Sequence, residues 1–261
     1  MLSIQVPPQL EGSPRCHRER LEDLLTLVKD FGLPHLLITL TADETSELRW
    51  SEIGDLEHIL DLMSTTASYT EAPVECAAQF MARFKKLLDE DILNKKNRAR
   101  GGIFGKVLRY MYRLEVQERG SLHVHMVLWL DPSDVDRVSS EIVACVPAEW
   151  DEATGEFIPP TDPEELLMYR LVRRKEIHKC SKVGCPNGCR RKGYCKEGAP
   201  WPINMDHTPR FNARTKRYDY YRPGVQHQWV VPYHPALLRL WGAHVNVYKI
   251  TNESWSRSVP G

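Results

Sequence analysis

The chain has 261 residues, of which 42% are hydrophobic and 27% are charged, as in an ordinary globular domain. Its formal net charge is zero, which argues against a histone-like or tail-like binder of nucleic acid. It has no apolar run of about eighteen residues and no basic-then-apolar leader at its N-terminus, so we expect no membrane partner.

The first elements follow from turn residues and apolar spacing. Prolines and glycine in residues 1–18 predict an extended segment. Leucines at helical spacing predict a helix over Leu21–Phe31, and the apolar, β-branched run Leu36–Thr41 predicts a buried strand. Within residues 42–69, an acidic stretch with a few apolar residues predicts a short helix over that strand.

The middle of the chain predicts longer elements. A helix is expected over Pro73–Ile92, because proline fits the first turn and apolar residues recur at helical spacing. A long strand is expected over Ile103–Glu118, followed by helices over Ser133–Val146 and Asp162–Arg174 with an acidic loop around Pro159 between them.

The last third begins with a cysteine-rich stretch and then predicts four short elements. They are strands over Arg217–Tyr221 and Gln228–Tyr233, a helical turn over Pro235–Trp241 and a final strand over His244–Ile250.

The stretch Tyr112–Leu130 predicts a β-hairpin, with Arg119-Gly120 at the turn. Its period-two alternation places His123 and His125 on one face of the second strand. Glu115 and Gln117 lie on the facing strand, and two imidazoles with an oxygen nearby can hold a divalent cation. The alternative is a pair of half-buried strand histidines without a ligand.

Cysteine and histidine side chains gather in one short, glycine-rich segment. Thiolates bind zinc tetrahedrally, and glycines let a short loop wrap an ion, so any four of these residues could hold a structural Zn²⁺. The alternative is a surface loop with free thiols. The candidates are His178, Cys180, Cys185, Cys189 and Cys195.

Basic residues with interleaved aromatic residues indicate a second kind of site. Such segments can contact a phosphate backbone while aromatic rings stack on bases; the alternative is solvated surface charge. The candidate DNA-binding residues are Arg109, Arg113, Arg119, Arg190, Arg191 and Lys192.

The hairpin YRLEVQERGSLHVHMVLWLD resembles that of the Helitron helicase-like domain, the Rep-type nuclease at the front of Helitron rolling-circle transposases. The family pattern Glu-x-Gln-x-Arg-Gly-x-x-His-x-His is filled by Glu115, Gln117, Arg119, Gly120, His123 and His125. The segments PPQLEGSP, FGLPHLLITLTAD and QHQWVVPYHPALLRLWGAHVNVYKI resemble further parts of the domain, so the resemblance covers nearly the whole chain.

The resemblance implies the α+β fold of the HUH endonucleases, a central antiparallel sheet flanked by helices. It implies cleavage of single-stranded DNA by a tyrosine, with Mg²⁺ or Mn²⁺ beside the phosphate. His123 and His125 would be ligands, Glu115 the first choice for a third ligand and Gln117 the second. A three-residue loop would set Gln117 opposite His123 and Glu115 opposite His125, whereas a two-residue loop would not.

The resemblance also implies a domain plan. We expect a Rep-like domain over residues 19–250, with a cysteine-rich insertion at 174–202 and a tail at 251–261. The family's nucleophilic tyrosines lie in a Tyr-x-x-Lys-Tyr helix beyond the Asn-Val strand, so the catalytic tyrosine is expected beyond residue 261. The family's helicase is normally in the same polypeptide, and no phosphate loop occurs here. We therefore expect an incomplete nuclease, inactive alone, and a nuclear location.

Two other hypotheses stay open from the sequence. One is a non-enzymatic DNA-binding remnant of a transposon, bound through the basic and aromatic segments. The other is an unrelated metallohydrolase that would use His123, His125 and Glu115 with bound water and would need no tyrosine.

Overall fold

The computed structural model describes residues 14–43, 73–116, 121–180, 190–191, 194–195 and 197–251. Strand β1 (Leu36–Thr41) is confirmed, as is the long helix, which forms α3 (Pro73–Lys86) and a π-helical continuation η1 (Leu87–Ile92). Helix α1 (Pro14–Phe31) starts earlier than predicted, so the expected extended segment is already helical from residue 14. The short helix expected within residues 42–69 lies outside the described residues, apart from residues 42 and 43.

The central hairpin consists of β2 (Val107–Val116) and β3 (Leu122–Leu130), paired antiparallel. β2 starts later than predicted, because Gly102 and Gly105 pair in a turn before it. Helices α4 (Pro132–Ser140) and α5 (Pro163–Lys175) follow, and α4 ends earlier than predicted. An aspartate precedes each helix and accepts hydrogen bonds from first-turn N–H groups, which satisfies donors that a helix start leaves unpaired.

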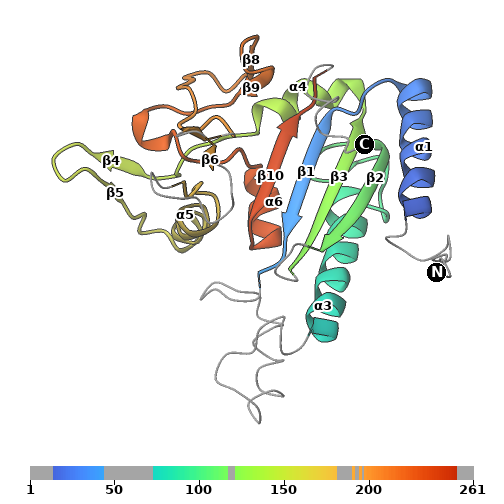
Figure 1. The fold of residues 1–261 in the computed structure, drawn as a ribbon. Coiled ribbons are helices and arrows are strands. Elements are labelled where there is room, and N and C mark those ends of the chain that lie inside the picture. Colours follow the sequence, from blue (N-terminus) through green and yellow to red (C-terminus); the bar gives the residue numbers. More distant parts are fainter. Residues whose placement is uncertain are drawn as a thin grey trace, which may run out of the picture.

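The main sheet has the strand order β10-β1-β3-β2, with β10 (Val245–Lys249) at one edge and all pairs antiparallel (Figure 1). One face carries the core, and its strand residues are fully buried: Leu36, Ile38, Leu40, Val124, Met126, Leu128, Val245 and Val247. Phe80 and Phe84 of α3 and Trp241 of α6 (Pro235–Trp241) pack in the same cluster. Figure 1 shows α3 and α6 behind the sheet. The predicted α+β fold with a central antiparallel sheet is therefore confirmed.

The C-terminal half adds short hairpins beside the sheet. The acidic loop expected around residue 159 is instead preceded by a hairpin of β4 (Glu149–Asp151) and β5 (Glu156–Ile158). Further two-stranded pairs are β6 (Arg190–Arg191) with β7 (Tyr194–Cys195), and β8 (Arg210–Asn212) with β9 (Arg217–Asp219). Within the described ranges, no helix is both long and apolar enough to cross a bilayer.

The predicted strand over Gln228–Tyr233 was wrong. A 3-10 turn, η2 (Val225–His227), precedes this segment, and only Val230 and Tyr233 form isolated bridges, each to a different partner segment. Pro232 lacks an N–H group and interrupts any ladder between them. Polar loop contacts therefore replace a continuous strand.

His227 provides a test of this part of the fold. Its ring is buried, its Nδ1 accepts a hydrogen bond from Val146 N at 3.1 Å, and Phe157 packs beside it with ring centroids 5.2 Å apart. Burial, together with the nearby charge of Arg222, lowers the pKa of His227 from 6.5 to about 4.

Between these values the unfolded chain binds a proton that the folded chain excludes, so stability falls as the pH drops from 6.5 to about 4. The pKa difference of His227 lowers the free energy of unfolding by at most about 3 kcal/mol over this pH range. Urea unfolding across that range should show a smaller pH dependence for His227→Asn, whose amide oxygen can still accept from Val146. The exposed His207→Asn variant is the matched control, and an unchanged pH profile for His227→Asn would contradict the assignment.

Candidate metal and nucleic-acid site

The two histidines of β3 lie on the side of the sheet opposite the core. Val124 and Met126 between and beside them are fully buried in the core, so alternation turns His123 and His125 the other way. We call this side the histidine face. One row across it consists of Arg113, His125, Thr39 and Asn246, which the register places opposite one another on four successive strands.

The register of the hairpin settles a point that the sequence left open. Glu115 pairs with His123. The expected pairing of Glu115 with His125 is therefore not present. Glu115 nevertheless reaches diagonally to His125, because cross-strand neighbours two residues apart are within range of long side chains.

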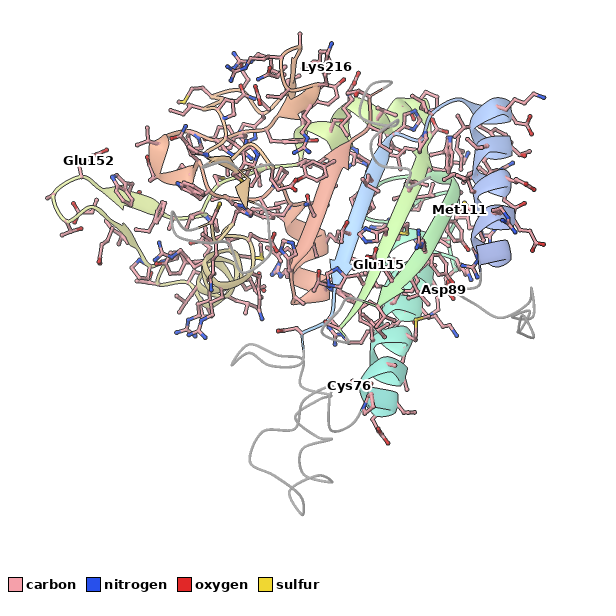
Figure 2. The ribbon with its side chains drawn as sticks, viewed as in Figure 1. Cys76, Asp89, Met111, Glu115, Glu152 and Lys216 are labelled. Carbon is pink, nitrogen blue, oxygen red and sulfur yellow. The ribbon has the colours of Figure 1, made fainter. Side chains whose placement is uncertain are left out.

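His125 contacts a partner at each ring nitrogen. Its Nε2 lies 3.0 Å from Oε2 of Glu115, and its Nδ1 lies 3.1 Å from Oγ1 of Thr39. A carboxylate can only accept, so the neutral ring carries its proton on Nε2 and Nδ1 accepts from the Thr39 hydroxyl. The side chain is 38% exposed and Glu115 is 48% exposed, so solvent reaches this pair. Figure 2 shows Glu115 of β2 lying toward β3.

This arrangement has the chemistry of a cation site. If Nε2 gives its lone pair to a cation, the ring proton moves to Nδ1, and the Thr39 hydroxyl can then accept it instead of donating. Threonine therefore satisfies the ring in both states. Glu115 supplies the anionic oxygen that hard divalent cations prefer.

His123 is on the same face but does not converge with this pair. Its ring is 7% exposed, and its centroid lies 6.3 Å from that of His125 with an angle of 39° between the planes. His123, His125 and Glu115 do not form a group whose ligand atoms all lie within 4.8 Å of one another. Coordination of one ion by all three side chains would require at least one of them to move. The donor atoms of these three side chains are types that bind a divalent ion, and two of the side chains, His125 and Glu115, are in contact.

The remaining hairpin residues that the sequence predicted as metal ligands or DNA contacts do not all lie near His125. Arg113 is exposed and lies opposite His125 in the same row. Arg109 donates to Leu108 O at 2.6 Å, and its guanidinium lies 4.8 Å from the ring of Phe31 at the end of α1. Gln117 and Arg119 lie outside the described residues.

The cysteine-rich segment forms a second site. Ligand atoms of His178, Cys180 and Cys195 all lie within 4.8 Å of one another, and Cys195 Sγ is 3.3 Å from His178 Nε2. Trp201 and Trp229 pack against the buried residues Cys195 and Ala199, and Cys180 is partly buried beside them. We call these three residues the Cys/His cluster. It could hold a metal ion.

Several predicted members of this segment cannot be placed. Cys185, Cys189 and Lys192 lie outside the described residues. Arg190 and Arg191 form strand β6, whose pairing with β7 is described, whereas their side chains are not.

Sequence reasoning missed the polar residues that β1 and β10 contribute to the histidine face. Thr39 orients His125, and the amide nitrogen of Asn246 donates to the Tyr248 hydroxyl at 3.1 Å. A signal for Thr39 was available, because the threonines of LLITLT alternate with buried apolar residues and so share one face. No comparable signal pointed to Asn246, since its neighbours on the face come from distant parts of the chain.

The family model for the Helitron helicase-like domain at the N-terminus matches residues 2–128. The matched range contains the whole of β1 and β2 and ends within β3, so it includes Glu115, His123 and His125. The Cys/His cluster and β10 lie beyond it. No curated protein matches the chain. Residues 2–128 of this chain are therefore similar to the Helitron helicase-like domain family.

Proposed function

We propose that this chain is the metal-dependent domain of a Helitron-type rolling-circle transposase that nicks and joins single-stranded DNA. Similarity to the Helitron helicase-like domain family supports a role related to Helitron transposition. The observation that carries the finer proposal is the contact of His125 with Glu115 and Thr39 on a solvent-exposed sheet face. A metal-binding histidine usually has its other ring nitrogen held by a hydrogen-bond partner, and Thr39 occupies that position at Nδ1 of His125.

In this proposal His125, Glu115 and His123 hold Mg²⁺ or Mn²⁺. The bound cation would offset the negative charge that builds up on a phosphate under attack. Thr39 keeps the His125 ring in one orientation, and Arg113 adds positive charge beside it, opposite His125 on β2. These residues would bind and orient a DNA phosphate.

The buried tyrosines of the described part are poorly suited to act as the nucleophile. The Tyr220 hydroxyl accepts a hydrogen bond from Lys249 N at 2.7 Å, and the Tyr233 hydroxyl donates to Cys145 O at 2.9 Å. Burial raises the pKa of Tyr220 and Tyr233, which disfavours the phenolate needed for attack. We therefore propose that residues 1–261 bind DNA and metal without cleaving the strand.

Cleavage can be tested directly. The chain is incubated with a labelled single-stranded oligonucleotide and Mn²⁺ and then resolved on a denaturing gel. We expect a complex under native conditions and no covalent adduct under denaturing conditions. An adduct would show that a tyrosine of this chain is the nucleophile, and absence of any complex would contradict the proposed function.

Metal binding tests the assignment of ligands. His125→Ala should lower Mn²⁺ affinity at least tenfold, since it removes a ligand. Thr39→Val should lower it by about tenfold or more, because outer-shell partners contribute on that order. Thr39→Ser keeps the hydroxyl and should bind nearly as wild type, which makes it the matched control. Calorimetric titration gives the affinities, and equal values for His125→Ala and wild type would contradict the site.

A non-enzymatic DNA-binding remnant is the second candidate, and one observation favours it. His123, His125 and Glu115 are not grouped as ligands of one ion in the described part of the chain, so no three-ligand site is preassembled. In that case DNA binding would persist in His125→Ala and would not depend on Mn²⁺. The proposed nuclease domain predicts instead that Mn²⁺ strengthens binding and that His125→Ala removes the increase.

We propose further that the Cys/His cluster holds a structural Zn²⁺, with Cys185 or Cys189 as the fourth ligand. Purified chain should carry one zinc per molecule, and Cys195→Ser should lose it and melt at lower temperature. Cys145→Ser is the matched control, because burial raises the pKa of Cys145 to about 11 and it lies apart from the cluster. Emission spectrometry measures the zinc. Full zinc content in Cys195→Ser would contradict the site, and comparison of Cys185→Ser with Cys189→Ser identifies the fourth ligand.

A further inference from the structure

A third histidine lies on the histidine face, one strand beyond the β1 threonines. Thr41 N donates to His244 O at 3.0 Å, which extends the row of Glu115, His123 and Thr41 to a fourth strand. Val245, the next residue, is fully buried in the core. Alternation therefore turns His244 to the histidine face.

A buried carboxylate holds the His244 ring from the outer edge of the sheet. Glu176, just after α5, is fully buried, and its Oε1 accepts from Val245 N at 3.0 Å. Its Oε2 lies 3.2 Å from Nδ1 of His244. Glu176 is therefore fixed by the backbone of β10 and cannot turn away from the ring.

The same contacts determine which ring nitrogen is outermost. Nδ1 of His244 also lies 2.9 Å from the carbonyl oxygen of Lys175, and a carbonyl can only accept. Nδ1 therefore keeps a proton in every charge state, and Nε2 is the nitrogen that gains or loses one. Nε2 makes no hydrogen bond to any described residue, and the side chain is 34% exposed.

The charges around the ring favour the imidazolium. Burial opposes a charge on His244, but Glu176 and the Lys175 carbonyl outweigh it, so the pKa of His244 is raised. The Lys175 ammonium acts in the opposite direction, and it is paired with Asp43 at 2.6 Å. His178 of the Cys/His cluster is near enough for its charge to interact with that of His244.

We propose that His244 binds a backbone phosphate of single-stranded DNA through Nε2–H, and that Glu176 is the residue that positions it. The inference rests on the proposed function and adds a contact to it. His244 and His123 are two strands apart, about 10 Å at the usual strand spacing. A single strand that contacts both His244 and the proposed metal ligands therefore crosses the sheet from β3 toward β10.

Two substitutions separate the roles of the ring nitrogens. In His244→Asn the amide nitrogen replaces Nδ1 and can still donate to Lys175 O, whereas nothing replaces Nε2. In His244→Gln the amide nitrogen reaches the position of Nε2 but carries no charge. His207→Asn, at an exposed histidine stacked on Tyr221, is the matched control.

The experiment measures anisotropy of a fluorescein-labelled single-stranded oligonucleotide over a series of salt concentrations, with and without Mn²⁺. His244→Asn should bind about tenfold more weakly, as expected for loss of a hydrogen bond between charged groups. The slope of log K against log salt should fall by about 0.7, the value for one phosphate contact on a single strand. His244→Gln should lose the same slope with a smaller loss of affinity, and His207→Asn should match wild type. Mn²⁺ affinity should be unchanged in all three.

Other outcomes would overturn the proposal in distinguishable ways. Unchanged affinity and slope in His244→Asn would remove the His244 contact and leave the proposed function standing. Weaker binding with an unchanged slope would exclude a phosphate as the group bound. Absence of binding by the wild-type chain would contradict the proposed function and the contact together. Thermal melting of each variant confirms that the fold is intact.

Discussion

Strand β3 pairs with β1 on one side and β2 on the other, and both registers are needed for the candidate site. The first places Thr39 opposite His125, and the second brings Glu115 within reach of the same ring. A shift of either pairing by one residue would turn the shifted strand's histidine-face residues into the core. Burial of Val124 and Met126 in the core cluster, which also contains Phe80 and Phe84 of α3, is therefore what fixes the positions of the residues on the histidine face.

The edge strand β10 links the sheet to the C-terminal half of the chain. Its outer N–H groups are not left open, since Val245 N donates to Glu176 and Val247 N donates to Pro232 O. A buried carboxylate at a sheet edge is costly unless its oxygens find partners. Here Oε1 of Glu176 accepts from the strand, whereas Oε2 has no hydrogen bond to any described residue and lies 3.2 Å from Nδ1 of His244 as an ion-pair contact. The Cys/His cluster follows directly after Glu176, so a metal there would stabilise the segment that holds this edge.

Local sequence patterns predicted the long helices and strands correctly. They failed for segments whose structure depends on contacts with distant parts of the chain. The helix from residue 73 has strong periodicity, the strand from residue 36 is a short apolar and β-branched run, and both are present. The β4–β5 hairpin was predicted as a loop because charged residues dominate its sequence. Its apolar residues Trp150 and Phe157 nevertheless pack their rings on each other. The segment 228–233 has the composition of a strand, but it lies between two different partner segments and pairs continuously with neither.

The sequence by itself determined the hairpin, the face shared by His123 and His125, and the grouping of cysteines with His178. These follow from period-two alternation and from short spacings along the chain, whereas the α+β class was implied by the resemblance to the Helitron helicase-like domain. Only the tertiary structure decided that Glu115 contacts His125 while pairing with His123, that Thr39 orients the ring, and that Glu176 and His244 meet at the edge of β10. The physical reason is that strand register and sheet order depend on how apolar residues from distant segments pack together, and no local pattern encodes that packing.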